Sequence, residues 1–139
     1  MTALPALRRH FRLPEDDETF LDGFGQPWEA IVEGSARWLI LRGLVLPAGY
    51  LQQVVDVAFM ITPMYPPGEL DMAYVHPWMV RSDGQPIPQT QIPQMIEGRS
   101  WQRWSRHRAP ANPWLPGEDD LASHIHYAQS WFAAEFERR

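Results

Sequence analysis

The sequence predicts an α+β domain: a four-stranded antiparallel meander with a short N-terminal helix, a long ordered loop and a C-terminal helix packed on the sheet. Four short segments rich in branched and aromatic residues follow one another, with turn residues between them. One segment near the C-terminus has apolar residues at helical spacing. A length of 139 residues is typical of one domain, so we expect a single domain over 1–139.

The N-terminal helix is expected directly after Pro14. Proline is favoured in a first helical turn, and the four acidic residues at 15–18 suit the positive end of the helix dipole. Gly23 can end the helix. The preceding residues, 1–13, mix apolar and basic side chains and are expected to form a partly ordered arm.

The four predicted strands lie between residues 28 and 75. They are 28–32, 37–41 with an extension towards 46, 54–61 and 70–75. The turns between them are signalled by Gly34-Ser35, Pro47–Tyr50 and Tyr65–Gly68. Short turns between successive strands indicate an antiparallel meander.

The remaining chain divides into a loop and a helix. Residues 76–117 show no clear period, but tryptophans at 78, 101, 104 and 114 favour an ordered loop over disorder. A short strand or a single turn is expected at 101–104. Asp119 or Asp120 can cap a helix that runs to about Phe136. Its apolar stripe, which we expect to pack on the sheet, consists of Leu121, Ile125, Ala128, Phe132 and Phe136.

The composition excludes several classes of chemistry. The chain has no cysteine, which rules out disulfides, thiolate metal sites and a cysteine nucleophile. A net charge of −5 argues against a nucleic-acid partner. No leader peptide and no apolar run of about 18 residues is evident, so we expect no membrane span and a cytoplasmic protein. All twelve basic residues are arginine. The absence of lysine fits a genomic preference for arginine codons. It also fits a protein that works beside acyl transfer and must not offer a lysine amine as an acceptor.

Three motifs occur in a fixed order: the Tyr65-Pro66 turn, His76-Pro77, and Trp114-Leu115-Pro116 before the last helix. This order resembles the ubiquitin-conjugating (E2, UBC) fold over about residues 14–137. More specific segments are Leu46–Tyr50, Tyr65-Pro66 with Leu70-Asp71, and above all Trp101–His107 (WQRWSRH) followed by Trp114–Asp119 (WLPGED). These segments resemble prokaryotic E2 family E.

The resemblance implies a bacterial pathway with a ubiquitin-like protein, an E1-like adenylating enzyme and often a JAB-type or other peptidase, a setting suspected of antiviral defence. The chain departs from active E2 enzymes at Trp78, where an asparagine is expected, and at about Pro88, where the cysteine is expected. It also lacks the second C-terminal helix of larger E2 enzymes. Thioester chemistry is therefore out of reach. The expected function is an adaptor that binds the ubiquitin-like protein or its E1. The alternative within the family is a noncanonical conjugating enzyme that uses a serine oxyester. A third interpretation is an unrelated α+β binding domain.

For the enzyme, Ser105 and His107 are the favoured catalytic pair. Residues two apart in an extended segment point to the same side, so the histidine can take the hydroxyl proton. His76 is a tentative third member, although bonding to backbone is its more ordinary role. Ser82 and Thr90 lie nearer the expected cysteine position but have no adjacent base in the sequence. The alternative for Ser105 is that its hydroxyl caps a turn.

For the adaptor, the expected partner-binding residues are Trp78, Trp101 and Trp104 with Arg103 and Arg106. Tryptophan supplies large rigid contact area, and seven of them cannot all be fully buried in a domain of this size. The arginines of 99–108 are also expected to reach the carboxylates of 118–120 and fix the loop as a wall beside the vacant cysteine position. His124 and His126 lie about 200° apart around a helix, so no metal site is expected, and no cofactor.

Overall fold

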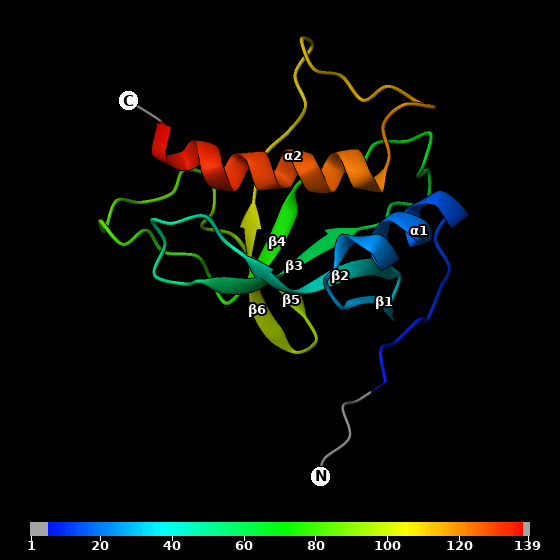
Figure 1. Ribbon diagram of the computed structural model, residues 1–139, viewed down its shortest axis with the longest axis horizontal. Coiled ribbons are helices and arrows are strands. Elements are labelled where there is room, and N and C mark those ends of the chain that lie inside the picture. Colours follow the sequence, from blue (N-terminus) through cyan, green and yellow to red (C-terminus); the bar gives the residue numbers. More distant parts are fainter. Residues whose placement is uncertain (1–5, 138–139) are drawn as a thin grey trace.

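Six antiparallel strands form one curled sheet in the computed structural model, which describes residues 6–137 (Figure 1). The order across the sheet is β1-β2-β3-β4-β6-β5. The strands are β1 Trp28–Glu33, β2 Ala36–Val45, β3 Val54–Met60, β4 Ala73–His76, β5 Pro93–Ile96 and β6 Arg99–Trp104. The α+β class is confirmed, but the expected four-stranded sheet is too small.

The two additional strands lie within residues 76–117, which were expected to form an ordered loop. β6 covers the short strand or single turn expected at 101–104, whereas β5 was not expected. β5 and β6 form a hairpin whose two-residue turn is Glu97-Gly98, with φ values of 57° and 72°. A turn with positive φ at both positions matches the twist of a hairpin, but glutamate rarely adopts it. β6 then pairs with β4, so Ala73 lies opposite Trp104.

The N-terminal helix, α1, spans Glu15–Phe24. It ends at Gly25, whose φ of 99° is left-handed, and not at Gly23 as expected. Of the expected N-terminal arm, residues 1–5 lie outside the described residues. The rest of the arm runs beside β1, since the His10 amide donates to the Ala30 carbonyl at 2.7 Å.

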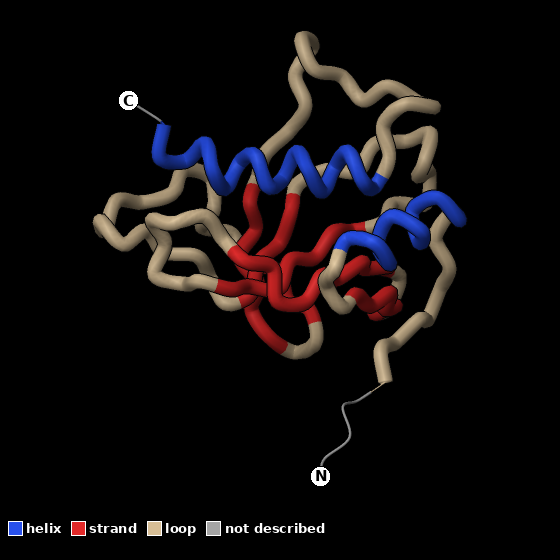
Figure 2. Tube along the Cα trace, in the orientation of Figure 1, coloured by secondary structure: helices blue, strands red, loops and turns tan. Residues whose placement is uncertain are grey.

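The C-terminal helix, α2 (Leu121–Ala134), crosses one face of the sheet, and a 3-10 turn, Glu135–Glu137, follows it (Figure 2). Asp120 caps it by accepting a hydrogen bond from the Ser123 amide at 3.0 Å. Four residues of the expected stripe are buried in the main core, and Phe136 is partly buried against it. Phe132 packs edge-on against Trp104, with ring centroids 4.9 Å apart.

The opposite face of the sheet has its own apolar cluster, which includes Trp38, Tyr74 and Trp101. The β5–β6 hairpin curls over this face, so that Glu97 at its turn reaches the first strands. Arg42 on β2 lies 3.0 Å from Glu97 and 2.6 Å from Glu29 on β1. These ion pairs join the hairpin turn to β1 and β2, and Trp101 is buried within the apolar cluster of this face.

Candidate functional site: Ser105, His107 and Asp71

The register of two neighbouring strands brings Ser105 and Asp71 together. Ser105 directly follows β6, and Asp71 lies two residues before β4. Because these strands are antiparallel and Ala73 pairs with Trp104, the residue after one strand lies beside the residues before the other. The Ser105 amide also donates to the Gln89 carbonyl at 3.0 Å, which fixes the backbone at this point.

The three side chains form a continuous hydrogen-bonded chain. The Ser105 hydroxyl oxygen lies 3.1 Å from Nε2 of His107, and Nδ1 of His107 lies 3.0 Å from each carboxylate oxygen of Asp71. A carboxylate only accepts hydrogen bonds, so in the neutral imidazole Nδ1 carries the proton. Nε2 is then free to accept the proton of the serine hydroxyl. The order of the three groups, hydroxyl, imidazole and carboxylate, is that of a Ser-His-Asp triad.

The site is open to solvent. The side chain of His107 is 59% exposed and that of Asp71 is 36% exposed, while Ser105 is partly buried. The residues that follow, 109–113, are exposed as well. The imidazole of His107 is therefore accessible to solvent.

Ser105 lies beside the position where the resemblance placed the missing cysteine. Its amide bonds residue 89, and the neighbouring Arg106 donates to the Pro88 carbonyl at 3.0 Å. Arg106 is held over the Trp104 ring, 4.8 Å from its centroid. A serine and a positive charge are thus attached to the loop segment at which the resemblance places the missing cysteine.

Asp71 is positioned by a contact with the helix. Met72, the next residue, has a φ of 61°, and its carbonyl accepts a hydrogen bond from Nε2 of His124 at 2.9 Å. His124 is 1% exposed, and burial lowers its pKa from the usual value of 6.5. The neutral imidazole of α2 therefore anchors the turn that carries Asp71. Sequence reasoning did not identify Asp71 or His124 as parts of the site.

The other candidate catalytic residues lie elsewhere. His76, at the far end of β4, is 3.3 Å from the Ser100 carbonyl through Nδ1 and stacks near Trp101. This is the backbone contact that was its ordinary interpretation, and the Ser105 site does not include it. The Ser82 hydroxyl donates to the Gly49 carbonyl at 3.0 Å, and the buried Thr90 hydroxyl donates to the Ile87 carbonyl at 2.8 Å.

Two tryptophans expected at a partner surface are buried. Trp101 and Trp104 are both 0% exposed, so neither can contact a partner directly. The curled hairpin covers Trp101, whose indole donates to the Ile96 carbonyl, and the main core takes up Trp104. Trp78 remains partly exposed, as do Arg103 and Arg106.

The predicted arginine wall is also different in detail. Among the arginines of 99–108, Arg108 lies 3.5 Å from Asp119. Arg99 instead pairs with Glu97 at 3.4 Å. Arg108 lies between the rings of Trp114 and Tyr127, with its guanidinium carbon 5.3 and 4.9 Å from the two centroids. Aromatic stacking therefore contributes to the position of this loop together with the ion pair.

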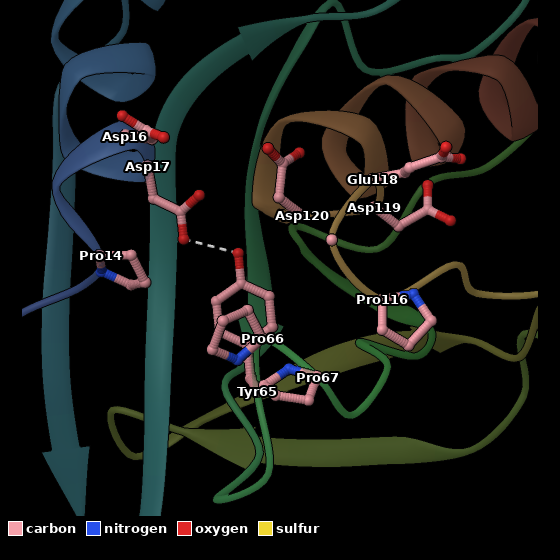
Figure 3. Close-up of a pocket in the computed structure, with 11 residues that line it drawn as sticks. Pro14, Asp16, Asp17, Tyr65, Pro66, Pro67, Pro116, Glu118, Asp119 and Asp120 are labelled. Atoms are coloured by element: carbon pink, nitrogen blue, oxygen red, sulfur yellow. Dashed lines mark hydrogen bonds between the residues drawn. The ribbon is translucent and has the colours of Figure 1, made fainter.

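An acidic groove of about 390 Å³ lies between α1, the Tyr65–Pro67 turn and the start of α2 (Figure 3). At its base the Tyr65 hydroxyl donates to Asp17 at 2.5 Å and accepts from the Leu121 amide at 2.7 Å. Burial raises the pKa of Asp17. Tyr65 therefore joins the two helices. Across residues 6–137, no group of three side chains has the geometry of a metal site.

The structure is a small α+β domain in which a serine, a histidine and an aspartate form a hydrogen-bonded chain. The sequence model of prokaryotic E2 family E matches residues 13–135, and the chain belongs to this family. Membership implies interaction with components of ubiquitin-like conjugation in general. No curated protein and no solved structure matches the chain. Neither helix in the described part of the chain is long and apolar enough to cross a membrane.

Proposed function

We propose that this protein is a noncanonical conjugating enzyme in which Ser105 carries the C-terminus of a ubiquitin-like protein as an oxyester. The observation that carries the proposal is the contact of the Ser105 hydroxyl with Nε2 of His107, whose other ring nitrogen contacts Asp71. The location beside Pro88 and Gln89 supports it, because an E2 holds its acyl group at this loop.

The proposed reaction has two transfers. In the first, the Ser105 oxygen attacks the activated carbonyl carbon, His107 takes the hydroxyl proton, and the adenylate or thiol leaving group departs from the carbonyl. In the second, an acceptor amine attacks the oxyester and forms an amide, and His107 takes the amine proton and passes it to the serine oxygen as that oxygen leaves. Asp71 holds the imidazole in the required tautomer and stabilises its charged form.

The partners in this proposal follow from family membership. They are a ubiquitin-like protein and an E1-like adenylating enzyme, together with a JAB-type or other peptidase that would reverse conjugation. We further propose an antiviral role, as suspected for such gene clusters. A cytoplasmic location fits the same pathway.

The direct test combines the protein with the E1-like enzyme and the ubiquitin-like protein of its gene neighbourhood, and with ATP. We expect an adduct that survives thiols and is lost in hydroxide, because an oxyester resists thiols better than a thioester does. Ser105→Ala should abolish the adduct. Ser82→Ala is the matched control, since this hydroxyl donates to the Gly49 carbonyl at 3.0 Å and not to an imidazole. An adduct that persists in Ser105→Ala would eliminate Ser105 as the carrier.

An adaptor function is the second candidate, and an exposed apolar patch favours it. Val45 and Val54 face each other across β2 and β3, and the Leu51 amide donates to the Val80 carbonyl at 2.8 Å. All four side chains are exposed, Val45 by 69%. Neighbouring exposed apolar side chains are typical of a protein-binding surface.

The adaptor function is tested by calorimetry with the ubiquitin-like protein and with the E1-like enzyme. We expect Ser105→Ala to bind as tightly as the wild type, and Leu51→Asp to weaken binding at least tenfold, about 1.4 kcal/mol. Val32→Asp, an exposed position on β1, is the control for a surface charge. Absence of binding to both proteins would refute the adaptor.

A further inference from the structure

We propose that Ser105, His107 and Asp71 also hydrolyse small activated esters without any partner protein. This activity uses the same nucleophile as the proposed conjugation but requires neither a ubiquitin-like protein nor ATP. It follows from the order of the three groups and from their exposure to water.

The hydrogen-bonded chain is complete in the protein alone. The contacts of 3.1 and 3.0 Å join hydroxyl, imidazole and carboxylate with no group missing between them. Asp71 is fixed from behind by the bond of the Met72 carbonyl to His124, and Ser105 by the bond of its amide to Gln89. The nucleophile and its base are therefore oriented before any substrate binds.

A positive charge lies next to the nucleophile. One terminal nitrogen of Arg106 is 3.0 Å from the Pro88 carbonyl and 3.2 Å from the carbonyl of Ser105 itself. The guanidinium is thus held one residue from the hydroxyl that attacks. Negative charge develops on the ester carbonyl oxygen in the transition state, and a nearby fixed cation stabilises it.

The exposure of His107 determines whether water can hydrolyse the acyl group from Ser105. Because the His107 side chain is 59% exposed, water can reach the imidazole after the first alcohol has left. In the acylation step the serine oxygen displaces the alcohol, which receives the serine proton through His107. In the second step Nε2 takes a proton from water, the hydroxide attacks the acyl carbon, and the serine oxygen leaves and regains the proton. The products are one acid and one alcohol for each ester and water consumed.

The experiment uses p-nitrophenyl acetate for turnover and a fluorophosphonate for covalent labelling, with the purified full chain alone. We expect a burst of p-nitrophenol followed by steady turnover, and one phosphonyl group on Ser105 by peptide mass spectrometry. Ser105→Ala should lose the label and reduce the turnover by about 10²-fold or more, the usual contribution of an activated group. His107→Gln and Asp71→Asn should slow both the burst and the labelling.

Two matched controls exclude simpler sources of ester cleavage. Ser82→Ala removes another loop hydroxyl, and His126→Gln removes an exposed imidazole on α2. Both should behave as the wild type. Turnover unchanged in Ser105→Ala, or a label on another residue, would overturn the proposal. An oxyester with the ubiquitin-like protein but no turnover of small esters would refute this inference alone, and the reverse result would refute only the conjugation proposal.

Discussion

Phe132 is the residue through which the core supports the strand that carries the site. It is 1% exposed and its ring meets Trp104, the residue immediately before Ser105, at 4.9 Å. Replacing it with alanine removes a buried ring and leaves a cavity between α2 and β6. Substitutions of this kind cost about 3–5 kcal/mol. A domain of this size is stable by about 5–15 kcal/mol, so the variant should still fold, with a melting temperature lowered by roughly 10–20 °C.

Urea denaturation followed by tryptophan fluorescence would measure this loss. The midpoint should fall while the slope against urea stays constant, since the same surface is exposed on unfolding. Val45→Ala, at an exposed position, is the control and should change stability by less than about 0.5 kcal/mol. Phe132→Asp or Ile125→Asp should unfold the domain, because each buries an unpaired charge. A cost below about 1 kcal/mol for Phe132→Ala would refute the packing of α2 on β6.

Three further results are expected. The free energy of unfolding should fall as the pH drops below 6.5. Burial keeps the pKa of His124 in the folded protein below its unfolded value, so the unfolded chain takes up the proton first. Chemical denaturation across pH should show a flatter dependence for His124→Gln, which retains a donor for the turn. Hydrogen bonds from Arg8 and Arg42 lower the pKa of Glu29 from 4.5 to about 2. The ionised Glu29 therefore stabilises the fold above pH 4.5, and this contribution is lost as the pH falls towards 2. In chemical denaturation, Glu29→Gln should be less stable than the wild type at pH 7 and approach its stability near pH 2. If the conjugation proposal holds, Arg106→Lys should place an amine beside the acylated serine and give a self-adduct that resists hydroxide on denaturing gels, whereas Arg37→Lys on β2 should not.

The parts of the fold with regular patterns were predictable from the sequence. The stripe repeats at helical spacing, and four of its five residues are buried in α2, although His124 and Trp131 are buried there as well and lie outside the stripe. β5 was not predicted, and β6 was expected only as a short strand or a single turn at 101–104, because the hairpin turn between them uses Glu97 in a conformation that the sequence does not signal. The expected exposure of Trp101 failed for the same reason, since it is this hairpin that covers the outer face.

The candidate site was partly predictable for a related reason. Ser105 and His107 are two residues apart, so local geometry was enough to pair them. Asp71 is 36 residues from His107 in sequence, and their contact depends on the register of β4 against β6. Register between distant strands is not visible in local patterns. The sequence motif Leu70-Asp71 drew attention to the residue without showing its chemical partner.

The absence of cysteine and the presence of this hydrogen-bonded chain have a common physical interpretation. A thiol can be activated by a modest fall in its pKa, whereas a serine hydroxyl needs a base that is already oriented. In this structure His107 lies between two groups that are themselves held in place. The carboxylate of Asp71 belongs to the turn before β4, and His124 of α2 bonds that turn. The hydroxyl of Ser105 follows β6, where the Ser105 amide bonds the 88–89 loop. If a serine carries the acyl group in place of a thiol, the fold must orient the base that activates it. The register of β4 and β6 supplies this orientation here.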